Sequence, residues 1–304
     1  MILVTGASGV LGKALTAALT RNGDAFRILS TNDGDLRDEA TTLRLFQEIR
    51  PRLVFHLAAR VHGLMGNKCF PAEMFIDNVR INSNVIDAAH KVQCKKIVAI
   101  SSVAVYSSDC QMPISEEMIW DGPPHGSEAS YGHVKRAMLA QLEAYNMQYG
   151  MAYACPILTN IYGPHDRFDS VYGHVVPSLI AKFYKSARDG TGVSVWGTGI
   201  AERDFISGQD AARALLLIAE KHIGPINVAT GMVCPIRDMV DILQKISKVD
   251  RITWDRSKPD GQIHRRYDVS KLLNLGFEPE LSLAEGLDMT YRWYAENFPN
   301  VRSS

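Results

Sequence analysis

The chain has 304 residues, with 33 basic and 33 acidic side chains, so its formal charge at pH 7 is zero. This length suits one large domain or two coupled domains, and the balanced charge argues against a nucleic-acid-binding surface. No apolar run is long enough to cross a membrane. The five cysteines lack paired spacing, which favours free thiols in a reducing compartment over a disulfide framework or a metal site. Because the first residues already predict a strand, we expect no signal peptide and a cytoplasmic location.

The first twelve residues predict a strand, a glycine-rich turn and the start of a helix. Such a turn gathers backbone N–H groups at a helix N-terminus, where the helix dipole favours a pyrophosphate. In this interpretation Gly6 allows the tight turn, Gly9 lets the diphosphate approach, and Gly12 lets helix and strand pack closely. A turn that merely needs glycine is the alternative. The expected dinucleotide contacts here are Gly6, Ser8, Gly9, Val10, Leu11 and Gly12.

The second predicted strand, residues 26–29, bears on the choice of cofactor. An acidic residue at its end would bind the adenine ribose 2′-hydroxyl and select NAD. Position 30 carries no carboxylate, so we expect NADP(H) rather than NAD(H), with the 2′-phosphate bound by Ser30, Thr31 and Asn32. Asp35, followed by Leu36, could reach the adenine amino group, and a solvated helix N-cap explains Asp35 equally well.

Alternating strands and helices continue along the chain. This alternation predicts an α/β fold with a Rossmann-type, doubly wound parallel sheet. The expected elements are a helix near 43–49, a strand at 53–55, a long helix at 71–92, a strand at 96–100 and a helix after Tyr131. Ligands of such a sheet bind beyond the carboxyl ends of its strands. Small residues after the third strand would let the cofactor lie there, and we expect contacts from Leu57, Ala58 and Ala59.

From about residue 166 the alternation loosens, and we expect a smaller domain that covers the substrate. The predicted division is an NADP-binding domain at 1–165 and a nucleotide-sugar-binding domain at 166–304. The two are expected to be partly interleaved, because residues 205–206 and 226–228 predict returns to the large sheet within 203–231. The helices at 71–92 and after Tyr131 each carry apolar stripes, which predicts a homodimer joined through a four-helix seam.

Tyr131 and Lys135 lie one helical turn apart at the start of a predicted helix. A free tyrosine has a pKa near 10, and a nearby ammonium is expected to lower this pKa toward the working range. Ser102, at the end of the fourth strand, could bind the same substrate oxygen. An ordinary amphipathic helix start is the alternative. Combined with the glycine-rich turn, these residues make the chain resemble the extended short-chain dehydrogenase/reductases.

Further stretches are similar to the GDP-L-fucose synthase family, and the resemblance covers nearly the whole chain. They are residues 56–63, 67–73, 83–90, 159–166, 174–177, 196–199, 203–205 and 257–261. Members of that family take GDP-4-keto-6-deoxymannose, epimerise it at C3 and C5, and reduce C4 with NADPH. The resemblance therefore implies a GDP-linked 4-keto sugar as substrate.

The resemblance also implies roles for individual residues. Ser102, Tyr131 and Lys135 would be the reductase triad, with Lys135 also holding the nicotinamide ribose. The nicotinamide pocket would be lined by Leu158, Asn160 and Ile161. His174 would be the acid–base histidine of epimerisation, and the GDP-sugar would be bound by Val175, Leu179, Lys182, Trp196 and Arg203. A helix-start histidine, a surface lysine, a core tryptophan and a structural ion pair are the simpler explanations.

One departure from that family bears on the reaction. The family's epimerisation cysteine lies two residues before the tyrosine that here is Tyr106, and this position holds Ala104. Epimerisation removes an α-proton on one face and returns one on the other, which takes an acid–base pair. We therefore expect a C4 reductase without C3/C5 epimerase activity. A complete GDP-L-fucose synthase, an epimerase that retains NAD⁺ and a non-catalytic NADP(H) sensor are the alternatives. Loops at 63–68, 107–130 and 164–173 are expected to read the sugar ring.

Overall fold

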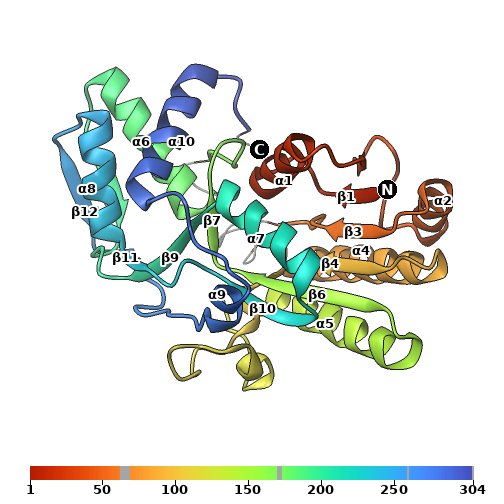
Figure 1. Ribbon diagram of the computed structural model, residues 1–304. Helices are drawn as coiled ribbons and strands as arrows, with labels where there is room; N and C mark the ends of the chain where they lie inside the picture. Colours follow the sequence, from red (N-terminus) through yellow and green to blue (C-terminus); the bar gives the residue numbers. More distant parts are fainter. Residues whose placement is uncertain (62–68, 170–172, 259, 303–304) are drawn as a thin grey trace.

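The structure is a computed structural model that describes residues 1–61, 69–169, 173–258 and 260–302. A seven-stranded parallel sheet runs through it in the order β10-β6-β4-β3-β1-β2, with the short β5 also paired to β6 (Figure 1). Since β2 and β3 flank β1 on opposite sides, the winding direction reverses at β1, where sheets of this kind bind ligands. The strands are β1 (Ile2–Thr5), β2 (Phe26–Leu29), β3 (Leu53–His56), β4 (Lys96–Ala99), β5 (Ser101–Ser102), β6 (Ala152–Leu158) and β10 (Gly224–Val228).

Helices cover both faces of this sheet because alternate strand residues point to opposite sides. In β1, Ile2 and Val4 pack with α1 (Val10–Arg21) and α7 (Gly208–Lys221), whereas Leu3 packs on the other side. That second side is covered by α2 (Glu39–Ile49), α4 (Pro71–Lys91) and α5 (Ala129–Tyr149). The expected Rossmann-type α/β fold is therefore confirmed.

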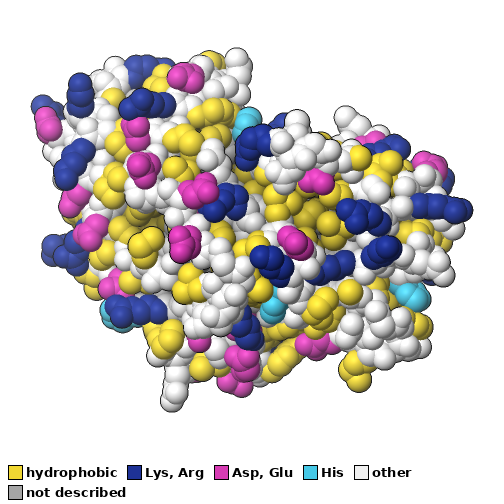
Figure 2. Space-filling model, in the orientation of Figure 1, with side chains coloured by type: hydrophobic (Ala, Val, Ile, Leu, Met, Phe, Trp, Pro, Cys, Tyr) yellow, Lys and Arg dark blue, Asp and Glu magenta, His cyan; other side chains and the backbone are white. Residues whose placement is uncertain are grey.

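A smaller part of the molecule has its own apolar cluster, centred on buried Phe183, Leu243 and Leu287. It lies beside the carboxyl ends of the large sheet, and an indentation of the surface separates the two parts in Figure 2. Its elements are β7 (Asn160–Tyr162), α6 (Val175–Asp189), β8 (Val193–Trp196), β9 (Glu202–Ser207), β11 (Val233–Pro235), α8 (Ile236–Ser247), β12 (Ile252–Asp255) and α10 (Leu283–Asn297).

One expected strand placement is wrong. Residues 205–206 lie in β9, which pairs with β7 and β11 in a separate three-stranded sheet and not in the large sheet. The edge of β6 that β9 would need is taken by β10, whose Ile226 lies opposite Pro156. The chain therefore returns to the large sheet at 226–228, while β9 supports the smaller part.

The remaining short elements are η1 (Val103–Val105), η2 (Glu116–Trp120) and α9 (Ser270–Asn274). All five cysteines fall within the described residues and are free thiols, as expected. In the described part of the chain, none of the helices has the length and apolar character needed to span a bilayer.

Candidate active site

The glycine-rich turn between β1 and α1 has the shape of a diphosphate cradle. Gly6 has a φ of 72°, and a Cβ added there would lie 2.5 Å from the Ala58 nitrogen, so only glycine fits against the end of β3. A Cβ on Gly12 would lie 2.4 Å from the Cα of Ala7. Gly9 is the N-cap residue of α1 and gives its first amides no side-chain cap. These amides can therefore bind an anion, with Ser8, Val10 and Leu11 beside them.

Buried polar residues hold the end of β3 next to this turn. The Thr5 hydroxyl lies 2.9 Å from Nδ1 of His56 and accepts a hydrogen bond from the Ala58 amide at 3.2 Å. Nε2 of His56 lies 3.1 Å from Oδ1 of Asn82 on α4. Burial lowers the pKa of His56 to about 3, so the imidazole is neutral. This group fixes the segment with Leu57, Ala58 and Ala59; the stretch 56–63 contains His56, but the pattern of residues there does not reveal this role.

The adenine end differs in detail from expectation. The Ser30 hydroxyl and amide both donate to Oδ2 of Asp33, at 2.7 and 2.8 Å, so this serine already has a carboxylate partner. These hydrogen bonds lower the pKa of Asp33. Thr31 and Asn32 are exposed on the same turn. The carboxylate of Asp33 thus lies close to the expected site of the 2′-phosphate.

Asp35 does not cap a helix, so that alternative is wrong. Its carboxylate accepts hydrogen bonds from Nε and Nη2 of Arg37 at 3.0 and 2.8 Å, and α2 is capped by Asp38. Arg37 also reaches the buried Asp77 at 3.2 Å. The carbonyl of Leu36 accepts from the side chains of Thr42 and Asn84. Asp35 is therefore held in place at the edge of the expected adenine site.

The triad residues come from β5 and α5, which pack against each other. Ser102 ends β5, and its hydroxyl accepts a hydrogen bond from the Ala104 amide at 3.3 Å. Tyr131 lies in the first turn of α5, and Nζ of the buried Lys135 lies 5.6 Å from the centroid of its ring. Lys135 donates to the carbonyl oxygen of Ile100 at 2.7 Å. This arrangement places one hydroxyl, one phenol and one ammonium at the carboxyl edge of the sheet.

The direction expected for the pKa of Tyr131 is wrong for the structure as it stands. Burial, and secondarily the Glu128 carboxylate, raises the pKa of Tyr131 above its ordinary value. The Lys135 ammonium, whose Nζ donates to the Ile100 carbonyl, does not reverse this rise. Burial also lowers the pKa of Lys135 to about 8. A protonated phenol suits a group that must donate a proton.

The residues expected to line the nicotinamide adjoin Ser102 directly. In the pairing of β5 with β6, Ser102 lies opposite Leu158, the last residue of β6. Asn160 begins β7, and its side-chain Nδ2 donates to the Asp204 carbonyl at 3.0 Å. Ile161 follows in β7 and packs partly buried against the large core. The structure therefore brings Leu158, Asn160 and Ile161 next to the triad strand.

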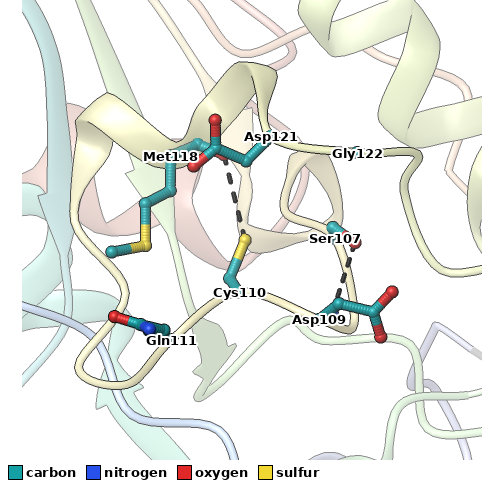
Figure 3. Close-up of a pocket in the computed structure, with 7 residues that line it drawn as sticks. All are labelled: Ser107, Asp109, Cys110, Gln111, Met118, Asp121 and Gly122. Carbon is teal, nitrogen blue, oxygen red and sulfur yellow. Dashed lines mark hydrogen bonds between the residues drawn. The ribbon is translucent and has the colours of Figure 1, made fainter.

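Ala104 is buried in η1, directly against α5. A Cβ added to Gly132, the residue after Tyr131, would lie 2.3 Å from the Ala104 carbonyl oxygen. Position 104 therefore lies close to the residue that follows Tyr131, and its side chain is only a methyl group. Cys110 does not replace the missing thiol, since it lines a separate cavity of about 310 Å³ (Figure 3). That cavity is lined by Ser107, Asp109, Cys110, Gln111, Met118, Asp121 and Gly122, without a triad residue.

His174 is the N-cap residue of α6, in the smaller part of the molecule, and is exposed to solvent. Desolvation, and secondarily the positive charge of Arg167, lowers its pKa. A neutral imidazole at this place can accept a proton. Val175 is partly buried at the start of α6, whereas Leu179 lies in the apolar cluster of the smaller part. The structure thus gives Leu179 a packing role.

A half-exposed indole forms the centre of the expected GDP end. Trp196 is 46% exposed, and Nζ of Lys182 lies 5.4 Å from its ring centroid. Lys258 approaches the same ring at 5.6 Å; its place in the stretch 257–261 does not by itself predict a role for it. Arg203 donates through Nη1 to the carbonyls of Glu202 and Gln262, at 2.7 and 2.6 Å, and burial lowers its pKa. These cations and the indole suit an anionic nucleotide.

Two of the loops expected to read the sugar ring are described only in part. Residues 63–68 lie outside the described residues, and so do 170–172 within the loop at 164–173. The loop at 107–130 is described throughout, and Arg136 of α5 donates to the carbonyl of Gly122 in it at 2.8 Å.

Comparison with known proteins defines the class of this fold and site. Residues 2–229 match the model of the NAD dependent epimerase/dehydratase family, and the chain belongs to that family. Within it, the chain is 33% identical over 315 residues to the GDP-L-fucose synthase of Escherichia coli (strain K12). The alignment covers 99% of this chain and 98% of that enzyme.

Solved structures give the same relationship. The NADP-bound GDP-L-fucose synthetase of Naegleria fowleri is 31% identical, with a TM-score of 0.93, over 99% of this chain and 94% of that one. A GDP-mannoheptose C4 reductase from Campylobacter jejuni, with NADP bound, is 25% identical, with a TM-score of 0.87, over 97% of this chain and 98% of that one. The chain is thus similar both to synthases and to a C4 reductase.

Proposed function

We propose that this protein is an NADPH-dependent reductase of the C4 ketone of a GDP-linked 4-keto-6-deoxy sugar, a hexose or a heptose. The observation that carries the proposal is Ala104, whose backbone contacts Ser102 and the residue after Tyr131 and whose side chain offers no acid–base group next to Ser102, Tyr131 and Lys135. The relatives include enzymes named as GDP-L-fucose synthases and as a GDP-mannoheptose C4 reductase. The GDP-linked substrate comes from this similarity.

The residues of the large sheet suit a dinucleotide. The amides of the turn at Gly9 would hold the diphosphate, and Ser30, Thr31 and Asn32 would face the 2′-phosphate of the adenine ribose. Leu158 and Ile161 would line the nicotinamide, whose bound reduced form supplies a hydride to the C4 carbon. NADP(H) is proposed over NAD(H) because NADP is bound in the structures of two relatives.

Three side chains of this protein would act on the C4 ketone oxygen of the substrate. Tyr131 donates the proton, which it holds because its pKa is raised. Ser102 donates a hydrogen bond that polarises the carbonyl, which favours negative charge on the oxygen as the carbonyl is reduced. Lys135 supplies a positive charge 5.6 Å from the Tyr131 ring, which stabilises the phenolate left after proton transfer.

Epimerisation needs a second acid–base group, and the described residues around position 104 offer none. His174 offers one base, and moving a proton from one face of an α-carbon to the other takes a partner acid on the opposite face. Ala104 supplies no such proton, and Cys110 faces its own cavity. We therefore infer that the reaction is reduction without exchange at C3 or C5.

The test is NADPH oxidation on GDP-4-keto-6-deoxymannose in D₂O, followed by NMR of the product. Oxidation with deuterium at neither C3 nor C5 supports the proposal. Deuterium at both carbons would instead mean a complete GDP-L-fucose synthase, the alternative that the named relatives favour. If NADPH is not oxidised, C3-epimerised and heptose substrates are tested, and failure of all of them would overturn the reductase assignment.

We also propose that the protein is a homodimer whose seam is formed by α4 and α5 of each chain. These helices lie side by side, with the Tyr145 hydroxyl 3.0 Å from Oδ1 of Asp87. Phe75 and Ile76 of α4 are 40% and 42% exposed, which leaves apolar surface for a partner.

A further inference from the structure

The C-terminal tail reaches back to the glycine-rich turn. After α10 ends at Asn297, the chain runs toward α1 (Figure 1). The amide of buried Phe168 donates to the carbonyl oxygen of Arg302 at 2.8 Å, and the ring of Phe168 packs against Trp293 and Tyr294 of α10. The backbone of Arg302 is therefore anchored to the core of the smaller part, even though its side chain is exposed.

The guanidinium of Arg302 lies over the N-terminal end of α1. A Cβ added to Gly9 would have Nη1 of Arg302 as its only neighbour within 4 Å among the described residues, at 3.7 Å. Gly9 is the uncapped N-cap residue of this helix. The N-terminus of a helix carries partial positive charge, so a cation here is unfavourable unless an anion lies with it.

Among the ion pairs of the described residues, none involves Arg302. The positive charge of Arg302 favours the ionised form of Asp166. Burial outweighs this effect and raises the pKa of Asp166 to about 7. Oδ1 of Asp166 accepts from the Arg167 amide at 2.7 Å, and its buried Oδ2 has no hydrogen-bond partner among the described residues. Asp166 and Arg302 do not form an ion pair with each other. Arg302 thus has a charge directed at a site built for an anion.

We propose that Arg302 binds the cofactor diphosphate, so that the C-terminal tail forms part of the NADP(H) site. This inference rests on the proposed cofactor function of the glycine-rich turn. The guanidinium would donate to the phosphate oxygens while the amides of α1 bind the same group. The backbone of Arg302 is anchored to Phe168 in the smaller part. The diphosphate would therefore be held from both parts of the molecule.

The test compares Arg302→Ala and Arg302→Lys with the wild type by titrating NADPH and 2′-AMP against the protein. Arg292→Ala is the matched control, because this arginine lies on α10 and pairs with Asp288 on the surface. We expect Arg302→Ala to weaken NADPH binding about ten-fold, as for loss of a charge-assisted hydrogen bond, and Arg302→Lys to weaken it less. Binding of 2′-AMP, which has no diphosphate, is expected to stay unchanged, as is the melting temperature of the free protein.

The outcomes distinguish a failure of the role of Arg302 from a failure of the cofactor assignment. Unchanged NADPH binding by Arg302→Ala, with a tight wild type, would overturn the role of Arg302 and leave the cofactor assignment intact. Equal weakening of NADPH and 2′-AMP would also overturn it, because the tail would then act on the fold. A wild type that binds neither ligand would overturn the cofactor function and this inference together.

Discussion

The ammonium of Lys135 lies 5.6 Å from the centroid of the Tyr131 ring, one helical turn away on α5. The two groups have different tasks at this distance, since the phenol is held protonated and the lysine carries the charge. Tyr131→Phe removes the proton donor but leaves the ring and its packing. We expect kcat to fall by about 10²- to 10⁴-fold, with the Kd for NADPH within about two-fold of wild type. Stopped-flow reduction and a binding titration would check this, and a Tyr131→Phe enzyme with normal kcat would contradict it.

The pH dependence should follow Lys135. Its pKa is lowered to about 8, so its charge is present at pH 7 and is lost as the pH rises through about 8. We expect kcat/KM to fall above pH 8, because the phenolate then loses its stabilising neighbour. In Lys135→Arg the guanidinium stays charged, so the descending limb should move to higher pH even if the maximum rate is lower. A limb that stays in place would show that another group titrates.

The lowered pKa of Lys135 also predicts how the free energy of unfolding depends on pH. A pKa that is lower in the folded than in the unfolded chain means that folding disfavours the charged form. The free energy of unfolding should therefore rise as the pH increases from about 8 toward the ordinary lysine value of about 10.4. Lys135→Met should raise the free energy of unfolding at pH 7 by about 1–3 kcal/mol while abolishing activity. Thermal melts of wild type and variant at pH 7 and 9.5 would measure both effects.

The large sheet could be predicted from local signals, and the smaller part could not. The turn around Gly6 and Gly12 combines strand, glycine spacing and helix within twelve residues, so sequence alone defines its geometry. By contrast, the partner of β9 is decided by competition with β10 for the edge of β6, a contact between distant segments. Such long-range pairing has no signature in the local pattern of residues 205–206.

At the site, likewise, the residue types could be predicted from the sequence, but their environment could not. The sequence predicts Tyr131 and Lys135 from their helical spacing and Ser102 from its place at a strand end. The direction of the pKa shift of Tyr131, however, depends on burial and on Glu128. Likewise, the absence of a carboxylate at Ser30 was visible in the sequence, whereas the return of Asp33 to bind Ser30 was not. Three-dimensional proximity decides these properties.

Asp33 should limit the preference for NADPH. Its carboxylate is held against Ser30 and its pKa is lowered, so it is ionised near the expected 2′-phosphate. Asp33→Asn removes this repulsion, and we expect the ratio of kcat/KM for NADPH over NADH to rise about two- to five-fold. Asp24→Asn, which changes an acidic residue before the start of β2, is the charge-matched control. A ratio that rises equally in both variants would point to net charge alone.

Restoring a thiol at position 104 tests the account of epimerisation. Ala104→Cys puts an acid–base group in place of a methyl group at a position whose backbone packs against α5 at the residue after Tyr131. We expect deuterium from D₂O to appear at C3 or C5 of the GDP-4-keto sugar with the variant and not with the wild type. Cys110→Ala should leave exchange unchanged in either background, because Cys110 lines another cavity. If Ala104→Cys folds and reduces normally but gains no exchange, residues beyond position 104 must also differ.

The proposed dimer seam gives the last prediction. Phe75 is an exposed aromatic residue on α4, and a charge there would be buried without a partner if two chains pack through α4 and α5. We expect light scattering at micromolar concentration to give twice the chain mass for the wild type and the chain mass for Phe75→Glu. Met232→Glu is the matched control, since Met232 is 61% exposed between β10 and β11 and belongs to neither helix of the seam. A monomeric wild type would contradict the seam, and a dimeric Phe75→Glu would move the interface to another surface.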